Sequence, residues 1–247
     1  MSISADSIIQ HIYTVNAKRD LAAKMGRIDA IKMLQEWQCR RLLTTHADLN
    51  AVPEFADAMQ FFVDELYGPK DFSQRDKDLT RVIPKLSAVL PEKALVALDD
   101  ALRLNALSFD LDSDMVGALL SRTGKDELAI SDITAESYAL AYRDVGREHD
   151  RAEQITIVEH LGLKLADVVH VRGINLLIKM ARKPAEIAGV LTLHEFLAEG
   201  FAAFKQLGDV RAFLDPIIRR ETAIMRALFA DDFSADDNPI PEVAQYV

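Results

Sequence analysis

The chain has 247 residues, of which 49% are apolar and 7% aromatic, and its 29 basic and 39 acidic side chains give a net charge of −10. This length and apolar content predict a globular protein with a sizeable core, and they exclude global disorder and collagen-like repeats. Because nucleic-acid phosphates bind basic proteins, the negative charge argues against a nucleic-acid partner.

The single cysteine, Cys39, excludes an intrachain disulfide and a cysteine-based zinc cluster. No run of about eighteen uncharged apolar residues is present, so no membrane-spanning helix is expected. The first twenty residues lack the basic start and apolar block of a signal peptide. We therefore expect a cytoplasmic protein without a membrane partner.

Apolar residues recur at helical spacing along the chain, Ala and Leu are abundant, and strand-like alternation is scarce. These patterns predict an all-α fold, a multi-helix bundle with long antiparallel helices and no β-sheet. The first fifty residues should form one or two long helices, with any break near Gly26. A helix over residues 53–67 should end at Gly68, because glycine tolerates the left-handed conformation and Pro69 cannot continue a helix.

In the middle of the chain, Pro91 should open a long helix that runs to about residue 108. The acidic, turn-rich stretch over residues 109–131 is interpreted as an internal hinge. A long helical region should then cover residues 132–182, with any interruption at Gly162 and its end at Pro184.

Two Phe-rich helices are predicted near residues 192–207 and 210–228, joined by a very short link at Gly208. The short link favours an antiparallel helix pair. Residues 231–247 carry five acidic side chains, two prolines and no base, so this acidic tail should be mobile or draped over a surface. We predict one helical domain over residues 1–230, followed by the tail.

The string FFVDELYGPKDFSQRD at residues 61–76, together with the run from Phe196 to Glu221, resembles an uncharacterised family of bacterial proteins that share FFxxELYGPxDFxxRD and a Phe-rich helix pair. The resemblance implies a bacterial source and brings no known activity or cofactor. In this string, Tyr67 and Arg75 are candidates for contacts to a small polar ligand. The alternative, which we favour, is a helix stop followed by a capped helix start.

The densely charged stretch over residues 143–153 lies within a predicted helix whose inward stripe passes through Tyr138, Tyr142 and His149. A histidine beside two phenols can serve as a general base or a ligand contact near neutral pH. The alternative is a solvated face whose charges pair at three- and four-residue spacing. We favour the solvated face.

Asp167 and His170 have the three-residue spacing that lets a carboxylate and an imidazole share a metal. Di-iron bundles need two Glu-x-x-His pairs, and this chain has none, so no metal site is predicted. Glu221 falls on the apolar stripe of the last helix and must find a partner, since burying a lone carboxylate is costly. Arg220 or an arginine of another helix is expected, and the pair would be a functional site only where a cavity adjoins it.

Three functions are compatible with these patterns. A noncatalytic interaction module with a protein partner ranks first, and homodimerisation would cover apolar surface that one core leaves exposed. A small-ligand or cofactor-binding bundle ranks second, with a pocket near Tyr142, His149 and His170. An acid/base enzyme ranks third, because it requires His149 or the Asp167/His170 pair to converge.

Overall fold

The computed structural model describes residues 5–68, 73–86 and 91–243. Within these ranges the chain forms eleven α-helices and no strand, which confirms the predicted all-α fold. The α-helices, with one π-helical turn (η1) and two short 3₁₀ turns (η2, η3), are α1 (Ala5–Lys24), α2 (Ile28–Thr45), α3 (Ala47–Asn50), α4 (Pro53–Phe61), η1 (Phe62–Tyr67), α5 (Ser73–Leu86), α6 (Glu92–Thr123), η2 (Ile130–Asp132), α7 (Ala135–Val145), α8 (Glu148–Val169), α9 (Ile174–Ile187), α10 (Leu191–Gln206), α11 (Val210–Phe229) and η3 (Ala235–Asp237).

The early helices begin and end near the predicted positions. Gly26 separates α1 from α2 with a φ of +67°. The helical stretch that starts at Pro53 ends at Gly68, but Gly68 is extended and not left-handed. A Cβ at Gly68 would lie 2.5 Å from the Asp64 carbonyl oxygen, so glycine is needed here for a close backbone approach and not for a positive φ.

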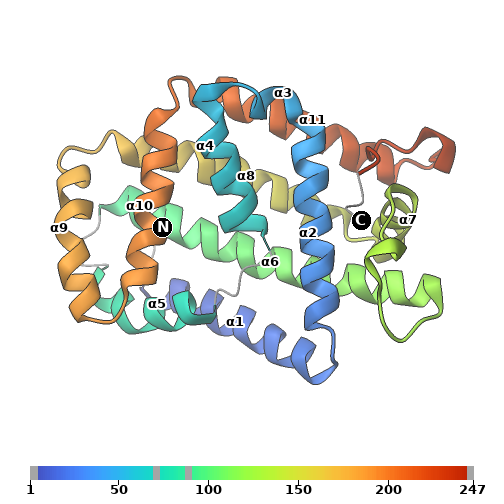
Figure 1. Ribbon diagram of the computed structural model, residues 1–247, viewed down its shortest axis with the longest axis horizontal. Coiled ribbons are helices and arrows are strands. Elements are labelled where there is room, and N and C mark those ends of the chain that lie inside the picture. The colour runs from blue at the N-terminus through green and yellow to red at the C-terminus, as the bar shows by residue number, and fades with distance from the viewer. Residues whose placement is uncertain (1–4, 69–72, 87–90, 244–247) are drawn as a thin grey trace.

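The longest helix, α6, runs along the length of the molecule and packs against α8 and α1 (Figure 1). It continues through residues 109–123, where the sequence suggested a hinge, and the loop begins only at Gly124. Two of the acidic side chains in this stretch, Asp110 and Asp114, accept hydrogen bonds from Arg147 at 2.8 and 2.7 Å, and Asp112 between them is buried. Apolar residues of α6 at helical spacing face the core.

The predicted helical region over residues 132–182 is divided in two places. Gly146 ends α7 with a φ of +65°, and Gly173, with a φ of +82°, precedes α9. Gly162, the predicted interruption, lies inside α8, where a Cβ would come within 2.7 Å of Leu214. Pro184 lies inside α9 and does not end it. The positive φ values explain why glycine occupies the two real breaks.

The two Phe-rich helices, α10 and α11, do not pack mainly on each other, so the predicted pair is wrong in its packing. Instead α10 packs on α4, α8 and α9, whereas α11 packs chiefly on α8. Phe204 of α10 and Phe213 of α11 both contact the ring of Phe62, with centroid distances of 5.7 and 6.0 Å. A residue from a third segment therefore joins the two helices in one core cluster.

The described part of the acidic tail lies over the end of the bundle that carries α7 (Figure 1). The Arg143 guanidinium stacks over the Phe233 ring at 4.8 Å and donates a 2.9 Å hydrogen bond to the Ala230 carbonyl. Ile240 is only 5% exposed and belongs to the same core cluster as Leu228. In the described ranges, no helix combines the length and apolarity needed to cross a bilayer.

Candidate functional site

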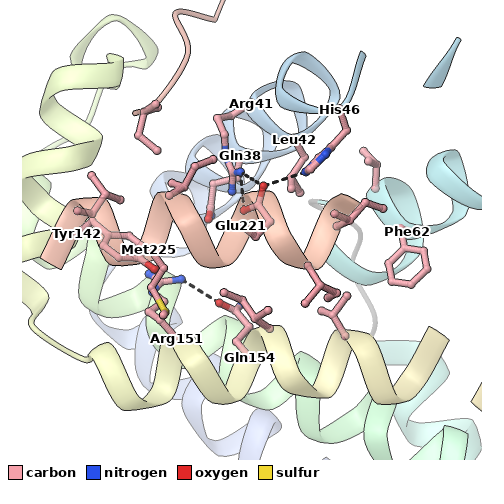
Figure 2. A pocket seen from close by; sticks show the side chains of 18 of the residues that line it. Gln38, Arg41, Leu42, His46, Phe62, Tyr142, Arg151, Gln154, Glu221 and Met225 are labelled. Carbon is pink, nitrogen blue, oxygen red and sulfur yellow. Dashed lines mark hydrogen bonds and ion pairs between the residues drawn. The ribbon is translucent and has the colours of Figure 1, made fainter. Parts of the chain in front are cut away.

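A cavity of about 80 Å³ lies between α2, α7, α8 and α11, beside Phe62 and the tail residue Ile240 (Figure 2). Protein cores contain few voids larger than a water molecule. One water needs about 10–15 Å³ of such space, so this cavity has room for about six water-sized groups. Its wall combines apolar side chains with buried charged groups.

One side of the cavity is a buried ionic cluster, the Glu221 cluster, formed by Glu221 of α11, Arg41 of α2 and His46 after α2 (Figure 2). Arg41 Nη1 lies 2.5 and 2.6 Å from the two carboxylate oxygens, and His46 Nε2 donates to Oε1 at 2.9 Å. Burial opposes ionisation of Glu221, but the charge of Arg41 and the hydrogen bond from His46 outweigh it and lower the pKa of the carboxyl to about 2. Glu221 is therefore ionised across the physiological range.

The partner of Glu221 comes from another helix, one of the two alternatives that the sequence left open. Arg220, the other alternative, points away from the cavity and binds Asp48 through two hydrogen bonds of 2.6 and 2.7 Å. The condition set by the sequence analysis is also met, since the cavity adjoins Glu221.

Across the cavity wall, Arg151 of α8 is 5% exposed. Its guanidinium lies over the Tyr142 ring at 4.5 Å, and Nη1 donates to Gln154 Oε1 at 3.2 Å. Gln154 is itself held by a 2.8 Å hydrogen bond from its amide to the Ser108 hydroxyl. Arg151 Nη2 is buried and makes no hydrogen bond. Two further buried atoms of the wall, Arg41 Nε and His46 Nδ1, are also without a partner.

A third set of polar groups lies behind Tyr138. The Tyr138 hydroxyl donates to Gln38 at 3.2 Å, and the Gln38 amide donates to Asp112 at 2.8 Å. Gln35 also donates to Asp112, at 3.0 Å, so both carboxyl oxygens are engaged. Burial raises the pKa of Asp112 and that of the Tyr138 phenol. The Trp37 ring stacks on Tyr138, with centroids 4.7 Å apart, and fixes this wall.

Among the sequence candidates, Tyr138 and Tyr142 line the cavity, whereas His149 does not. The His149 side chain is 93% exposed, because the left-handed Gly146 ends α7 and a new helix begins with a different register. The predicted inward stripe therefore fails after Tyr142. The spacing argument applies only within one continuous helix, so it does not extend across this break.

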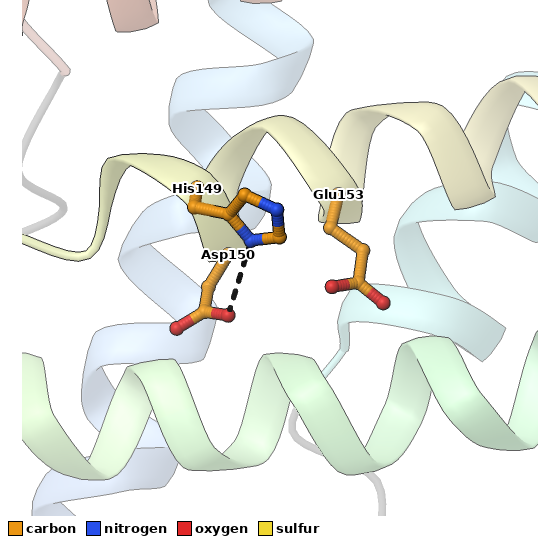
Figure 3. Close-up of side chains that lie close together, drawn as sticks. All are labelled: His149, Asp150 and Glu153. Atoms are coloured by element: carbon orange, nitrogen blue, oxygen red, sulfur yellow. Dashed lines mark ion pairs between the residues drawn. The ribbon is translucent and has the colours of Figure 1, made fainter.

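His149, Asp150 and Glu153 form an exposed cluster whose ligand-type atoms lie within 4.8 Å of one another (Figure 3). Asp150 accepts a 2.6 Å hydrogen bond from Arg147, and Glu153 is paired with Arg103. His149 Nδ1 is 4.0 Å from Asp150. The Arg147–Asp150 pair has the three-residue spacing of the solvated-face interpretation, whereas Glu153 pairs with an arginine of α6 that lies 50 residues earlier in the chain.

Asp167 and His170 lie at the opposite end of α8 and are exposed. Asp167 binds Lys93 at 2.9 Å, and His170 Nδ1 donates to the Ala166 carbonyl at 2.7 Å. At 1.5 Å per residue, Asp167 is about 24 Å along the helix from Arg151. His149 and His170 are therefore not brought together, which removes the geometry that the acid/base hypothesis required. The side chains of Tyr67 and Arg75 lie outside the described residues.

Four residues of the cavity wall were not predicted from the sequence: Arg41, His46, Arg151 and Gln154. A signal was present for Arg151, because it shares a helical stripe with Ile155, Val158 and Gly162 at spacings of four, seven and eleven residues. An arginine on an apolar stripe is as unusual as the carboxylate of Glu221 on the apolar stripe of α11. His46 follows the end of a helix and has no such signal.

No curated protein and no solved structure matches this chain. One family model, described as a domain of unknown function (DUF8198), matches residues 18–235. The match includes α2, α7, α8 and α11, and so every polar residue of the cavity wall named above. The resemblance drawn from the sequence is supported at the level of an uncharacterised family, while its bacterial source stays a prediction. The chain belongs to the DUF8198 family of unknown function.

Proposed function

We propose that this protein binds a small molecule in the cavity between α2, α7, α8 and α11. The main support for the proposal is a cavity of about 80 Å³. Among the residues that line it, three buried polar atoms have no hydrogen-bond partner. Buried polar groups in folded proteins are nearly always hydrogen-bonded, and unpaired ones are costly. A ligand with polar and apolar parts would satisfy these atoms and fill the remaining space.

The composition of the wall supports a ligand site over a packing defect. Small-molecule sites are mostly apolar with a few polar groups that orient the ligand, and helical bundles often place them in their interiors. Here Ile217, Ile224 and Met225 supply apolar surface, while Arg151 and the Glu221 cluster supply the polar groups. A simple void between apolar side chains would contain no such groups.

The test measures thermal unfolding midpoints of the wild-type protein with a panel of small acids, amides, alcohols and amines. At least one class should raise the midpoint. Ile224→Phe, which places a larger side chain in the cavity wall, should abolish the rise. Ile187→Phe is the matched control, because Ile187 is 88% exposed and belongs to α9. An unchanged midpoint with every class, or a response that survives Ile224→Phe, would contradict the proposal.

Self-association through α9 is a second candidate function and is related to the homodimerisation that the sequence suggested in addition to an interaction module. Leu176, Met180 and Ile187 on this helix are 61, 67 and 88% exposed, and the exposed Lys179 and Lys183 lie among them. Exposed apolar side chains of this size favour an interface. A second copy of this acidic chain would offer negative surface to the two lysines.

Sedimentation velocity tests this second candidate. The wild-type protein should show a concentration-dependent dimer, and Met180→Glu should shift it to monomer. Met25→Glu is the control, since Met25 is 50% exposed at the end of α1. A monomer at all concentrations would refute self-association, as would equal effects of the two substitutions.

A further inference from the structure

We propose that the ligand of the cavity is a small monocarboxylic acid, whose carboxylate accepts hydrogen bonds from Arg151 and whose body lies against the apolar wall. This inference rests on the proposed ligand-binding function and specifies the chemical class of the ligand. It begins from the state of Arg151, a guanidinium that is buried in the cavity wall and has a free donor.

Arg151 forms no direct ion pair, although its charge acts on the nearby Asp112 and opposes the rise in the pKa of that carboxyl. Its Nη1 donates to the neutral amide oxygen of Gln154, and its face lies on the neutral ring of Tyr142. Within the described residues, no carboxylate oxygen lies within 4.0 Å of it. Buried charges in proteins are normally paired, and a guanidinium in this state is suited to an anion supplied from outside the chain.

The neighbouring carboxylates are already engaged. Both oxygens of Glu221 bind Arg41, and Oε1 also binds His46. Both oxygens of Asp112 accept hydrogen bonds from the amides of Gln35 and Gln38. Neither carboxylate is therefore available to Arg151 without breaking its existing bonds, so an additional anion fits the remaining donor.

The direction of the free donor is fixed by its neighbours. The Ser108 hydroxyl accepts a hydrogen bond from the Gln154 amide nitrogen. The oxygen of the same amide accepts a hydrogen bond from Nη1 of Arg151 (Figure 2). Nη2 is the other end of the same planar group, so its position follows from these two bonds. A planar guanidinium that is held in place in this way binds a carboxylate with little further loss of side-chain freedom.

Charge and size limit the ligand to a monoanion of few atoms. A second carboxylate on the ligand would face the ionised Glu221 across the same cavity, and like charges repel strongly at short range in a low dielectric. Space for about six water-sized groups matches an acid of about six to eight non-hydrogen atoms. Leu214, Ile217 and Met225 can contact an apolar body, which inorganic phosphate lacks.

The experiment is isothermal titration calorimetry of the wild-type protein at pH 7 with butyrate, valerate and hexanoate. Each acid is compared with its primary amide, which has the same shape without the charge, and inorganic phosphate is a further probe. We expect the acids to bind about tenfold to a hundredfold more tightly than the amides, the range of one charge-assisted hydrogen bond. Phosphate should bind more weakly than the acids.

Arg151→Met should reduce the affinity for the acids by a similar factor while leaving the amides unchanged. Arg226→Met is the matched control, because Arg226 is an exposed arginine of α11, and it should retain wild-type affinity. Circular dichroism verifies that both variants are folded. The comparison of acid with amide on the wild-type protein needs no variant.

Equal affinity for acids and amides would overturn the carboxylate assignment, and so would phosphate binding as tightly as the acids or full acid affinity in Arg151→Met. If amides, alcohols or amines bind and acids do not, the ligand-binding function stands and only the ligand class is wrong. If no probe of any class binds or raises the unfolding midpoint, the ligand-binding function itself is wrong.

Discussion

Replacing Glu221 by glutamine tests how the Glu221 cluster stabilises the fold. The substitution keeps the shape of the side chain and removes its charge, so Arg41 is left buried without its counter-ion. Removing one partner of a buried pair costs about 3–5 kcal/mol. We therefore expect Glu221→Gln to lower the free energy of unfolding by about this amount at pH 7.

The pH dependence gives a second, independent magnitude. The pKa of Glu221 falls from an ordinary value of 4.5 to about 2 in the folded protein. At 1.36 kcal/mol per unit, this difference corresponds to about 3 kcal/mol of stability. Because the folded pKa is the lower one, this contribution is complete above about pH 5 and is lost as the pH falls towards 2.

Urea unfolding at several pH values between 7 and 3 checks both effects, with the fluorescence of Trp37, the sole tryptophan, as the signal. The raised pKa of Asp112 acts in the opposite sense, because it adds stability as the pH falls, but its contribution is common to both proteins and cancels in their difference. The difference between wild type and Glu221→Gln should shrink as the pH falls. Glu186→Gln, at an exposed position of α9, should follow the wild-type curve. A difference that is constant with pH would refute the linkage argument.

Three more predictions concern packing and burial in the bundle. Gly117→Ala should raise the free energy of unfolding by about 0.5–1 kcal/mol, because the added Cβ would meet no atom closer than 3.5 Å. Gly200→Ala should lower it by about 1–3 kcal/mol, because the added Cβ would lie 2.7 Å from the Phe61 ring. Equal effects of the two substitutions in thermal unfolding would contradict this expectation. Cys39 should resist iodoacetamide in the native protein and react only on unfolding, since burial raises its thiol pKa to about 12; rapid native labelling, followed by mass spectrometry, would show otherwise. Ile240→Ala should cost about 2–4 kcal/mol in urea unfolding if the tail segment is part of the core, and a loss below about 0.5 kcal/mol would show that it is not.

The sequence was sufficient to predict the helices but not to predict where one helix ends and the next begins. Helical periodicity identified the all-α class and the break at Gly26, because each depends on local spacing. It did not show which glycines between α7 and α9 lie at a helix break and which lie inside a helix. Gly146 and Gly173 have positive φ values and end or precede helices, whereas Gly162 makes room for Leu214 on a helix far away in the sequence. A single sequence does not reveal which of these two reasons applies to a given glycine.

The same limit applies to the site. Glu221 was recognisable alone, since a carboxylate on an apolar stripe requires a partner wherever that partner lies. Its actual partner, Arg41, is 180 residues earlier in the chain. The error at His149 came from a helix break that reset the register, so one misplaced junction moved a predicted site residue from the core to the solvent.

A structural arginine and a ligand-binding arginine predict opposite results for Arg151→Met without ligand. If Arg151 stabilises the fold through its contacts with Gln154 and Tyr142, its removal should cost more than about 2 kcal/mol. If Arg151 instead serves to bind an anion, its charge has no ion-pair partner in the ligand-free protein. The variant, with a methionine of similar volume, should then fold equally well, within about 1 kcal/mol of wild type. Urea unfolding of Arg151→Met and wild type distinguishes the two, with Arg226→Met as control. Because Nη2 has no hydrogen bond and no carboxylate partner, we expect the second result, and a loss above about 2 kcal/mol would assign Arg151 to the architecture of the bundle instead.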